Sequence, residues 1–138
     1  MKYIIKDIPP SNNKYIGTGR KGSNFTYQEE KKEWEWLVRA AVGKDKPQEP
    51  LKNVLVVLTY YFPTKHRRDP DNYSGKFLLD GLVKAKVIED DSFKCIELRI
   101  NGKYDKKNPR TEIEILEIKK MKCEVVKEAR KSAKRIVK

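Results

Sequence analysis

Two carboxylates, Asp69 and Asp71, are spaced one residue apart directly after a long apolar run. Carboxylate oxygens at this spacing suit a hard divalent cation such as Mg²⁺, which binds through one or two carboxylates and keeps several waters. Arg67 and Arg68 precede the pair, and Lys76 follows it. Anionic metal ligands set among cations are what a phosphodiester reaction requires, so this segment is a candidate active site.

The same residues also suit the start of a helix. Asp69 would be the N-cap, Pro70 the first helical residue and Asp71 a favourable charge in the first turn. Lys76 and Asp80 are four residues apart, and on a helix they would form an ordinary surface ion pair. Capping and metal binding are compatible, and the spacing alone leaves both open.

Further pieces of the sequence follow the carboxylate pair in a fixed order. After Lys76 come the segment Leu78-Leu79-Asp80-Gly81-Leu82 and then the pair Asp90-Asp91. Near the N-terminus, the segment Pro10-Ser11-Asn12-Asn13 is followed by Tyr15. In order and spacing, over residues 3 to 118, the chain resembles the RusA-type Holliday junction resolvases.

This resemblance implies a metal-dependent endodeoxyribonuclease. Its substrate would be branched DNA, a four-way junction above all, and a homodimer would resolve it by paired hydrolytic nicks. The resemblance implies Asp69, Asp71 and Asp91 as catalytic metal ligands, with Mg²⁺ or Mn²⁺ as cofactor and no small-molecule cofactor. It implies Lys76 as a catalytic residue that neutralises developing charge, and Asp90 is an adjacent candidate ligand. The alternatives are a non-catalytic basic DNA-binding protein, or a nuclease of different specificity on the same scaffold.

The composition indicates one basic domain. The chain has 138 residues, 32 Lys and Arg against 20 Asp and Glu, a net charge of +12 and a pI near 9.6. Such a charge favours a polyanionic partner, nucleic acid or an acidic membrane surface, although it also serves solubility alone. No apolar run approaches the roughly 18 to 20 residues of a membrane span, and the N-terminal apolar stretch is too short for a signal peptide. We therefore expect a protein without a membrane partner.

The cysteines and the histidine exclude other chemistry. Cys95 and Cys123 are isolated and lack metal-ligand spacing, which is typical of reduced thiols in a cytoplasmic protein. His66 is the only histidine, so a Ser/His/Asp triad is not available. Because His66 stands beside Arg67 and Arg68, it suits a surface or phosphate contact better than a general base.

Basic residues in two loops are candidate DNA contacts. Residues 9–25 are rich in Pro, Ser, Asn and Gly, and we expect them to form a loop that contacts phosphates, although a plain solvent loop fits equally well. The expected DNA-binding residues of this loop and of the segment before Asp69 are Lys14, Arg20, Lys21, Arg67 and Arg68.

Hydrophobic patterning predicts a single α+β domain over residues 1–118, with a small mixed or antiparallel sheet and helices packed on it. Strands are predicted at residues 2–8, 52–62, 93–101 and 111–118, and helices at 27–42 and 70–86. The run at 52–62 is continuously apolar, which predicts a central strand buried on both faces. The alternation at 93–101 and the return at 111–118 predict an antiparallel hairpin. Thr26 would cap the first helix in a capping box with Glu29.

The last twenty residues differ in character from the rest. Residues 119–138 hold nine Lys or Arg and two Glu, so +7 of the net +12 lies there. They form either a basic tail helix or a frayed end. The helix starting at residue 70 would place Asp69 and Asp71 where the central strand ends, and helix N-termini also favour phosphate.

Overall fold

The structure, a computed structural model, describes residues 1–14, 21–118 and 130, and for residues 21–25 it describes the backbone alone. The predicted tail at 119–138 therefore lies, except for Arg130, outside the described residues. In chain order the elements are β1 (Lys2–Ile5), the 3-10 helix η1 (Asn12–Lys14), α1 (Lys21–Val42), β2 (Val54–Phe62), the 3-10 helix η2 (Pro70–Tyr73), α2 (Lys76–Lys84), β3 (Ile96–Tyr104) and β4 (Arg110–Glu117).

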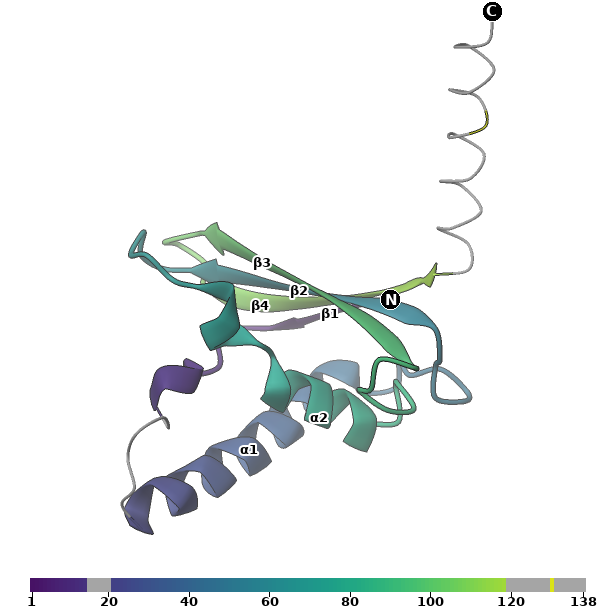
Figure 1. Cartoon of the computed structure of the whole chain (residues 1–138), viewed down its shortest axis with the longest axis horizontal. Helices are drawn as coiled ribbons and strands as arrows, with labels where there is room; N and C mark the ends of the chain where they lie inside the picture. Colours follow the sequence, from purple (N-terminus) through teal and green to yellow (C-terminus); the bar gives the residue numbers. More distant parts are fainter. Residues whose placement is uncertain (15–20, 119–129, 131–138) are drawn as a thin grey trace, which may run out of the picture.

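The strands form one mixed sheet in the order β1-β4-β2-β3 (Figure 1). β2 pairs parallel with β3 and antiparallel with β4, and β4 pairs antiparallel with β1. The single α+β domain predicted from the sequence is thereby confirmed, as is the central position of β2.

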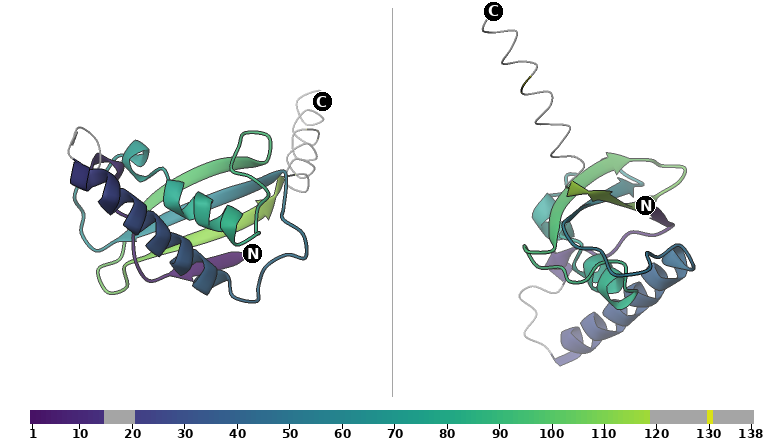
Figure 2. Two further views of the ribbon diagram at one scale, coloured as in Figure 1. Left: turned by 90° about the horizontal axis from the view of Figure 1, so that it is seen from below. Right: turned by 90° about the vertical axis from the view of Figure 1, so that its right-hand side faces the viewer.

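Both long helices lie on the same face of the sheet (Figures 1 and 2). Alternate residues of β2, among them Leu58, point to this face and are fully buried. The two helices pack closely because Gly81 of α2 lies against Val38 of α1, where an added Cβ would come within 2.8 Å of the Val38 Cβ. None of the described helices is long and apolar enough to cross a bilayer.

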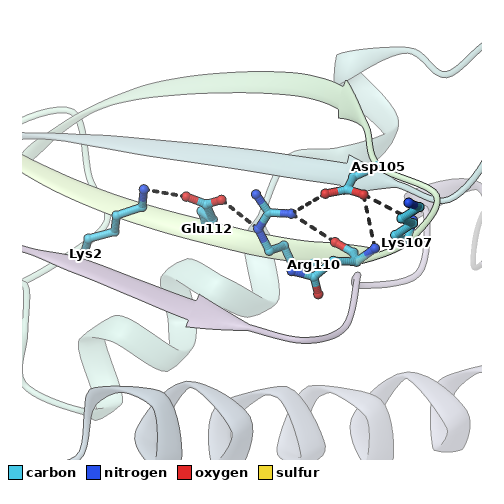
Figure 3. A network of polar contacts seen from close by, with 6 residues as sticks. Lys2, Asp105, Lys107, Arg110 and Glu112 are labelled. Carbon is cyan, nitrogen blue, oxygen red and sulfur yellow. Dashed lines mark hydrogen bonds and ion pairs between the residues drawn. The ribbon is translucent and has the colours of Figure 1, made fainter.

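Within residues 1–14 and 21–118, no helix covers the opposite face of the sheet, and the prediction that β2 is buried on both faces was wrong. The residues of β2 that point there, Val57 and Tyr61 among them, are only half-buried. Glu112 of β4 is 8% exposed on this face. Its carboxylate lies 2.6 Å from the Lys2 Nζ and 2.8 Å from the Arg110 Nε (Figure 3). Arg110 also stacks on the Tyr61 ring at 3.7 Å.

The predicted hairpin of the last two strands was also wrong. β3 and β4 lie on opposite sides of β2, because the chain after β3 passes the end of β2 before it returns. At that crossing the Asp105 N–H donates to the Phe62 carbonyl at 2.8 Å. Alternation in a sequence defines which face a residue points to, but it does not specify the neighbouring strand.

Two helix boundaries differ from the predicted ones. α1 begins at Lys21, so Thr26 lies inside the helix and does not cap it. The predicted helix at 70–86 is divided by Gly75, whose φ of +78° lies in the left-handed region. A residue in that conformation cannot continue a right-handed helix, so η2 and α2 are separate elements.

Candidate active site

Asp69 and Asp71 lie within residues 69–75, a turn that follows the C-terminal end of β2 and is called the carboxylate turn below. Asp69 directly precedes η2 in an extended conformation, and its side chain makes no capping hydrogen bond. Its backbone carbonyl accepts from the Asn72 N–H at 3.0 Å instead. Asp71 is exposed in the first turn of η2. The capping interpretation is thus wrong for the Asp69 side chain, although Pro70 does occupy the first helical position as predicted.

A hydrogen bond from β2 fixes the turn to the sheet. The Tyr60 hydroxyl donates to the Tyr73 carbonyl at 3.0 Å. Burial raises the pKa of the Tyr60 hydroxyl well above its usual range, so the group stays a donor throughout the physiological range. At Gly75 an added Cβ would lie 2.2 Å from the Leu58 Cδ1, so only glycine fits between the turn and the core.

The N-terminal segment holds the turn from the side. The Asn12 amide donates to the Asp71 carbonyl and to the Ser74 Oγ, each at 3.0 Å. Sequence reasoning placed Asn12 in a matching motif without giving it a role. The roles of Tyr60 and Gly75 were missed as well, because Tyr60 resembles an ordinary core residue. A signal for Gly75 was present, since a glycine inside an otherwise helical pattern often marks a break.

Arg67 and Arg68 differ sharply in their surroundings. The Arg67 side chain is 90% exposed, with its Nε 3.4 Å from the Asp69 Oδ1. The Arg68 guanidinium is engaged inside the loop, where it donates to the Thr64 carbonyl and hydroxyl and to the His66 carbonyl. It also stacks on the Phe62 ring at 4.2 Å. Arg68 therefore shapes the loop before Asp69, whereas Arg67 is open to a phosphate.

The other predicted DNA contacts are described only in part. Lys14 forms an ion pair with Glu30 of α1. Lys21 is the first residue of α1, and its side chain is not among the described ones. Arg20 lies outside the described residues. Their contacts with DNA stay predictions.

Lys76 is exposed at the first position of α2, one residue after the Gly75 break. The ordinary surface pair predicted with Asp80 is not the contact that forms. Asp80 lies toward α1 instead, with its Oδ2 3.9 Å from the Lys31 Nζ. Lys76 is thus positioned by the helix start that follows the carboxylate turn, which favours a role at the candidate site over a helical surface pair.

Asp90 and Asp91 lie at the other end of the sheet from the turn. The preceding segment pairs with Leu51, which donates to the Val87 carbonyl and accepts from the Glu89 N–H just before β2 begins. Asp69 follows the far end of β2, and a strand of that length spans about 26 Å. Among the described residues, no cluster of three or more His, Cys, Asp or Glu forms a metal site. A single chain therefore brings Asp69 and Asp71 together without Asp91.

One known protein family matches most of the chain. The family of the endodeoxyribonuclease RusA matches residues 7–116. The chain belongs to this family. The matched range includes Asn12, the carboxylate turn, Lys76 and Asp91, and it ends within β4. No curated protein sequence matches the chain. As a member of this family, the protein is an endodeoxyribonuclease. The turn after β2 is a described segment whose residues suit phosphodiester hydrolysis.

Proposed function

We propose that the protein is a Mg²⁺-dependent endodeoxyribonuclease that resolves four-way DNA junctions by paired hydrolytic nicks. The observation that carries the proposal is the turn after β2, where Asp69 is free of any capping bond and Asp71 is exposed. Tyr60 and Gly75 restrain the backbone of the turn that carries these residues. Preorganised charge is the main contribution of a protein to phosphodiester hydrolysis.

The residues of the turn fit a hard divalent cation. Their donors are carboxylate oxygens, which Mg²⁺ and Mn²⁺ both accept. Asp69 and Asp71 would hold the cation. When bound, a divalent cation supplies an acidified water and polarises a phosphoryl oxygen.

Two cations of the chain complete the proposed chemistry. Lys76, at the start of α2, neutralises negative charge that develops on the phosphate as the phosphodiester is attacked. Arg67, exposed beside Asp69, contacts a neighbouring phosphate and holds the backbone of the DNA over the turn. Arg68 supports both by keeping the loop folded.

The position of Asp91 supports a homodimer with shared sites. If Asp91 is a ligand, it must reach a turn that lies about one strand length away in its own chain. A two-fold dimer removes this difficulty, because each subunit then offers its carboxylate turn to Asp91 of the partner subunit. A two-fold assembly also matches the approximate two-fold symmetry of a four-way junction.

Cleavage of a synthetic four-way junction and of a linear duplex, each with and without Mg²⁺, tests the activity. We expect metal-dependent paired nicks in the junction and little product from the duplex. Asp71→Asn should abolish cleavage and leave junction binding intact or tighter, since it removes a charge that repels phosphate. Equal cutting of both DNAs would indicate a different nuclease specificity, and binding without product would indicate a non-catalytic DNA-binding protein.

Mixing two inactive variants tests the shared site. In a heterodimer of Asp71→Asn and Asp91→Asn subunits, a shared arrangement leaves one site with all its ligands intact and the other with two lesions. We expect the mixture to recover single-strand nicking that neither variant shows alone. If each site is built from one chain, both sites carry a lesion and the mixture stays inactive. That result would refute the shared site while leaving the metal-dependent activity in place.

A further inference from the structure

We propose that Asn12 is a positioning residue for the carboxylate turn: its side-chain amide fixes the backbone that carries Asp71. This inference deepens the proposed function and rests on it. Asn12 belongs to η1, which lies far from the turn in sequence but against it in the fold, since residues 12 and 71 are separated by 59 positions.

Both amide hydrogens of Asn12 are used by the turn. One is donated to the Asp71 carbonyl and the other to the Ser74 Oγ, each at 3.0 Å. A carbonyl oxygen only accepts, so the nitrogen of the amide must be the atom that faces Asp71. The two acceptors lie three residues apart: Asp71 is the second residue of η2, and Ser74 directly follows η2. A single side chain therefore links the two ends of the turn.

The turn needs an outside contact of this kind because it is short. η2 has four residues, and 3-10 helices have weaker hydrogen-bond geometry than α-helices. Tyr60 fixes the carbonyl of Tyr73 from the sheet side. Asn12 fixes the carbonyl of Asp71 itself, and it thereby restrains the peptide that follows the Asp71 Cα.

Asn12 is itself held in place by the rest of the fold. The fully buried Thr111 of β4 donates its hydroxyl to the Asp7 carbonyl at 2.7 Å, which anchors the chain after β1. Pro9 is buried, and the Lys14 N–H donates to the Ser11 carbonyl at 3.2 Å to close η1. The N-terminal segment is therefore a brace between β4 and the carboxylate turn.

Two substitutions at Asn12 and two matched controls at Asn108 test the inference. Asn12→Asp keeps the shape of the side chain but removes both donors, whereas Asn12→Ala removes the amide without adding charge. Asn108→Ala and Asn108→Asp are matched controls, because Asn108 is an asparagine in the turn before β4 whose backbone, not its side chain, forms its described hydrogen bonds. Effects common to both Asn12 variants and absent from both controls are due to the removal of the donors.

Three measurements on the full chain separate positioning from folding. We expect faster hydrogen exchange confined to residues 71–75, and Mn²⁺ binding, followed by electron paramagnetic resonance, weakened by about 10- to 100-fold in Asn12→Ala. The single-turnover cleavage rate of a saturating junction should fall by a similar factor, while junction affinity without metal stays at the wild-type value. The melting temperature identifies any general loss of stability.

The inference is overturned if exchange at residues 71–75 and Mn²⁺ affinity match those of wild type. It is equally overturned if the losses are global, with exchange rising throughout the core in parallel with a lowered melting temperature. Failure of the proposed function is a separate result, because wild-type protein would then leave the junction uncut. Hydrogen exchange and Mn²⁺ binding would still decide whether Asn12 holds the turn.

Discussion

Lys76 is the residue whose role in catalysis is most directly testable. Because its ammonium neutralises charge only as the phosphate is attacked, its loss should affect turnover far more than binding. We expect Lys76→Ala to lower the single-turnover rate on a saturating junction by roughly 100-fold, the scale for one preorganised group. Lys76→Arg should rescue poorly, since a planar fork does not replace a compact ammonium. Lys84→Ala, at the far end of α2, is the control, and a wild-type rate in Lys76→Ala would remove the lysine from the mechanism.

Glu112 makes the stability of the sheet depend on pH. The ion pairs with Lys2 and Arg110 hold the pKa of Glu112 below its ordinary value of 4.5. The unfolded state therefore binds a proton first as the pH falls, so the contribution of Glu112 is present above its ordinary pKa and is lost in acid. We expect urea unfolding of Glu112→Gln to depend less on pH than that of wild type below pH 4.5.

Some acid sensitivity should persist in that variant. Arg110 also lowers the pKa of Asp105, and the Glu112→Gln substitution leaves the ion pair between Arg110 and Asp105 in place. An unchanged pH dependence would mean that the Glu112 pairs contribute nothing to stability.

At this scale, sequence alone identified the residues that carry charge but not those that position them. Asp69, Asp71 and Lys76 are readable because their types and spacing are chemically specific. Asn12 contacts a turn 59 residues away, and a hydrogen bond of that range leaves no local pattern. The Arg68 guanidinium binds its own loop, and nothing in the string Arg67-Arg68 distinguishes the two residues. The contact of Arg68 with phosphate stays a prediction.

At the scale of the element, the backbone conformation of the carboxylate turn depends on Gly75. Gly75→Ala combines a left-handed φ, which costs a non-glycine residue about 1 to 2 kcal/mol, with a clash against Leu58, and overpacking adds about 1 to 3 kcal/mol. Gly43→Ala is the matched control, because Gly43 also has a positive φ of 53° but its nearest neighbour to an added Cβ is 3.8 Å away.

We expect the free energy of unfolding, measured in urea, to fall clearly more for Gly75→Ala than for Gly43→Ala. Equal losses would show that the contact with Leu58 relaxes freely. Cleavage should also fall for Gly75→Ala, since the turn must shift to admit the methyl group.

The strands were predictable as elements, whereas their pairing was not. The alternation of β3 predicts that Ile96, Leu98 and Ile100 point inward. Ile96 is buried and Ile100 packs against the core, whereas Leu98 is 40% exposed. The partner of β3 is determined by the crossover through α2. This connection places β3 beside β2 and parallel to it. Likewise, the apolar run of β2 marked a central strand but did not show that one of its faces is only half-buried, because half-buried and buried β-branched residues look alike in a sequence.

For the whole molecule, the distribution of charge gives a prediction about DNA affinity. Residues 119–138 carry +7 of the net +12. Deleting them should weaken DNA binding broadly and make it less dependent on salt, with the slope falling by about 0.9 for each duplex phosphate that the shortened protein no longer neutralises. The sites of cutting in the junction should not change.

Binding isotherms at several salt concentrations, together with thermal melting, test this. An unchanged salt slope with a lower melting temperature would refute the DNA role and assign the segment to stabilising the domain.

The position of β4 has a consequence for how the chain is made. β4 lies between β1 and β2, although it is the last strand in the described part of the sequence, and among the described strands it is the partner of β1. During synthesis β1 therefore stays unpaired until about a hundred further residues have left the ribosome. Contacts across such separations form late and slowly. The Asp7 carbonyl is bound by Thr111 of the same late strand, so the brace that leads to the carboxylate turn is anchored to the sheet only when β4 inserts.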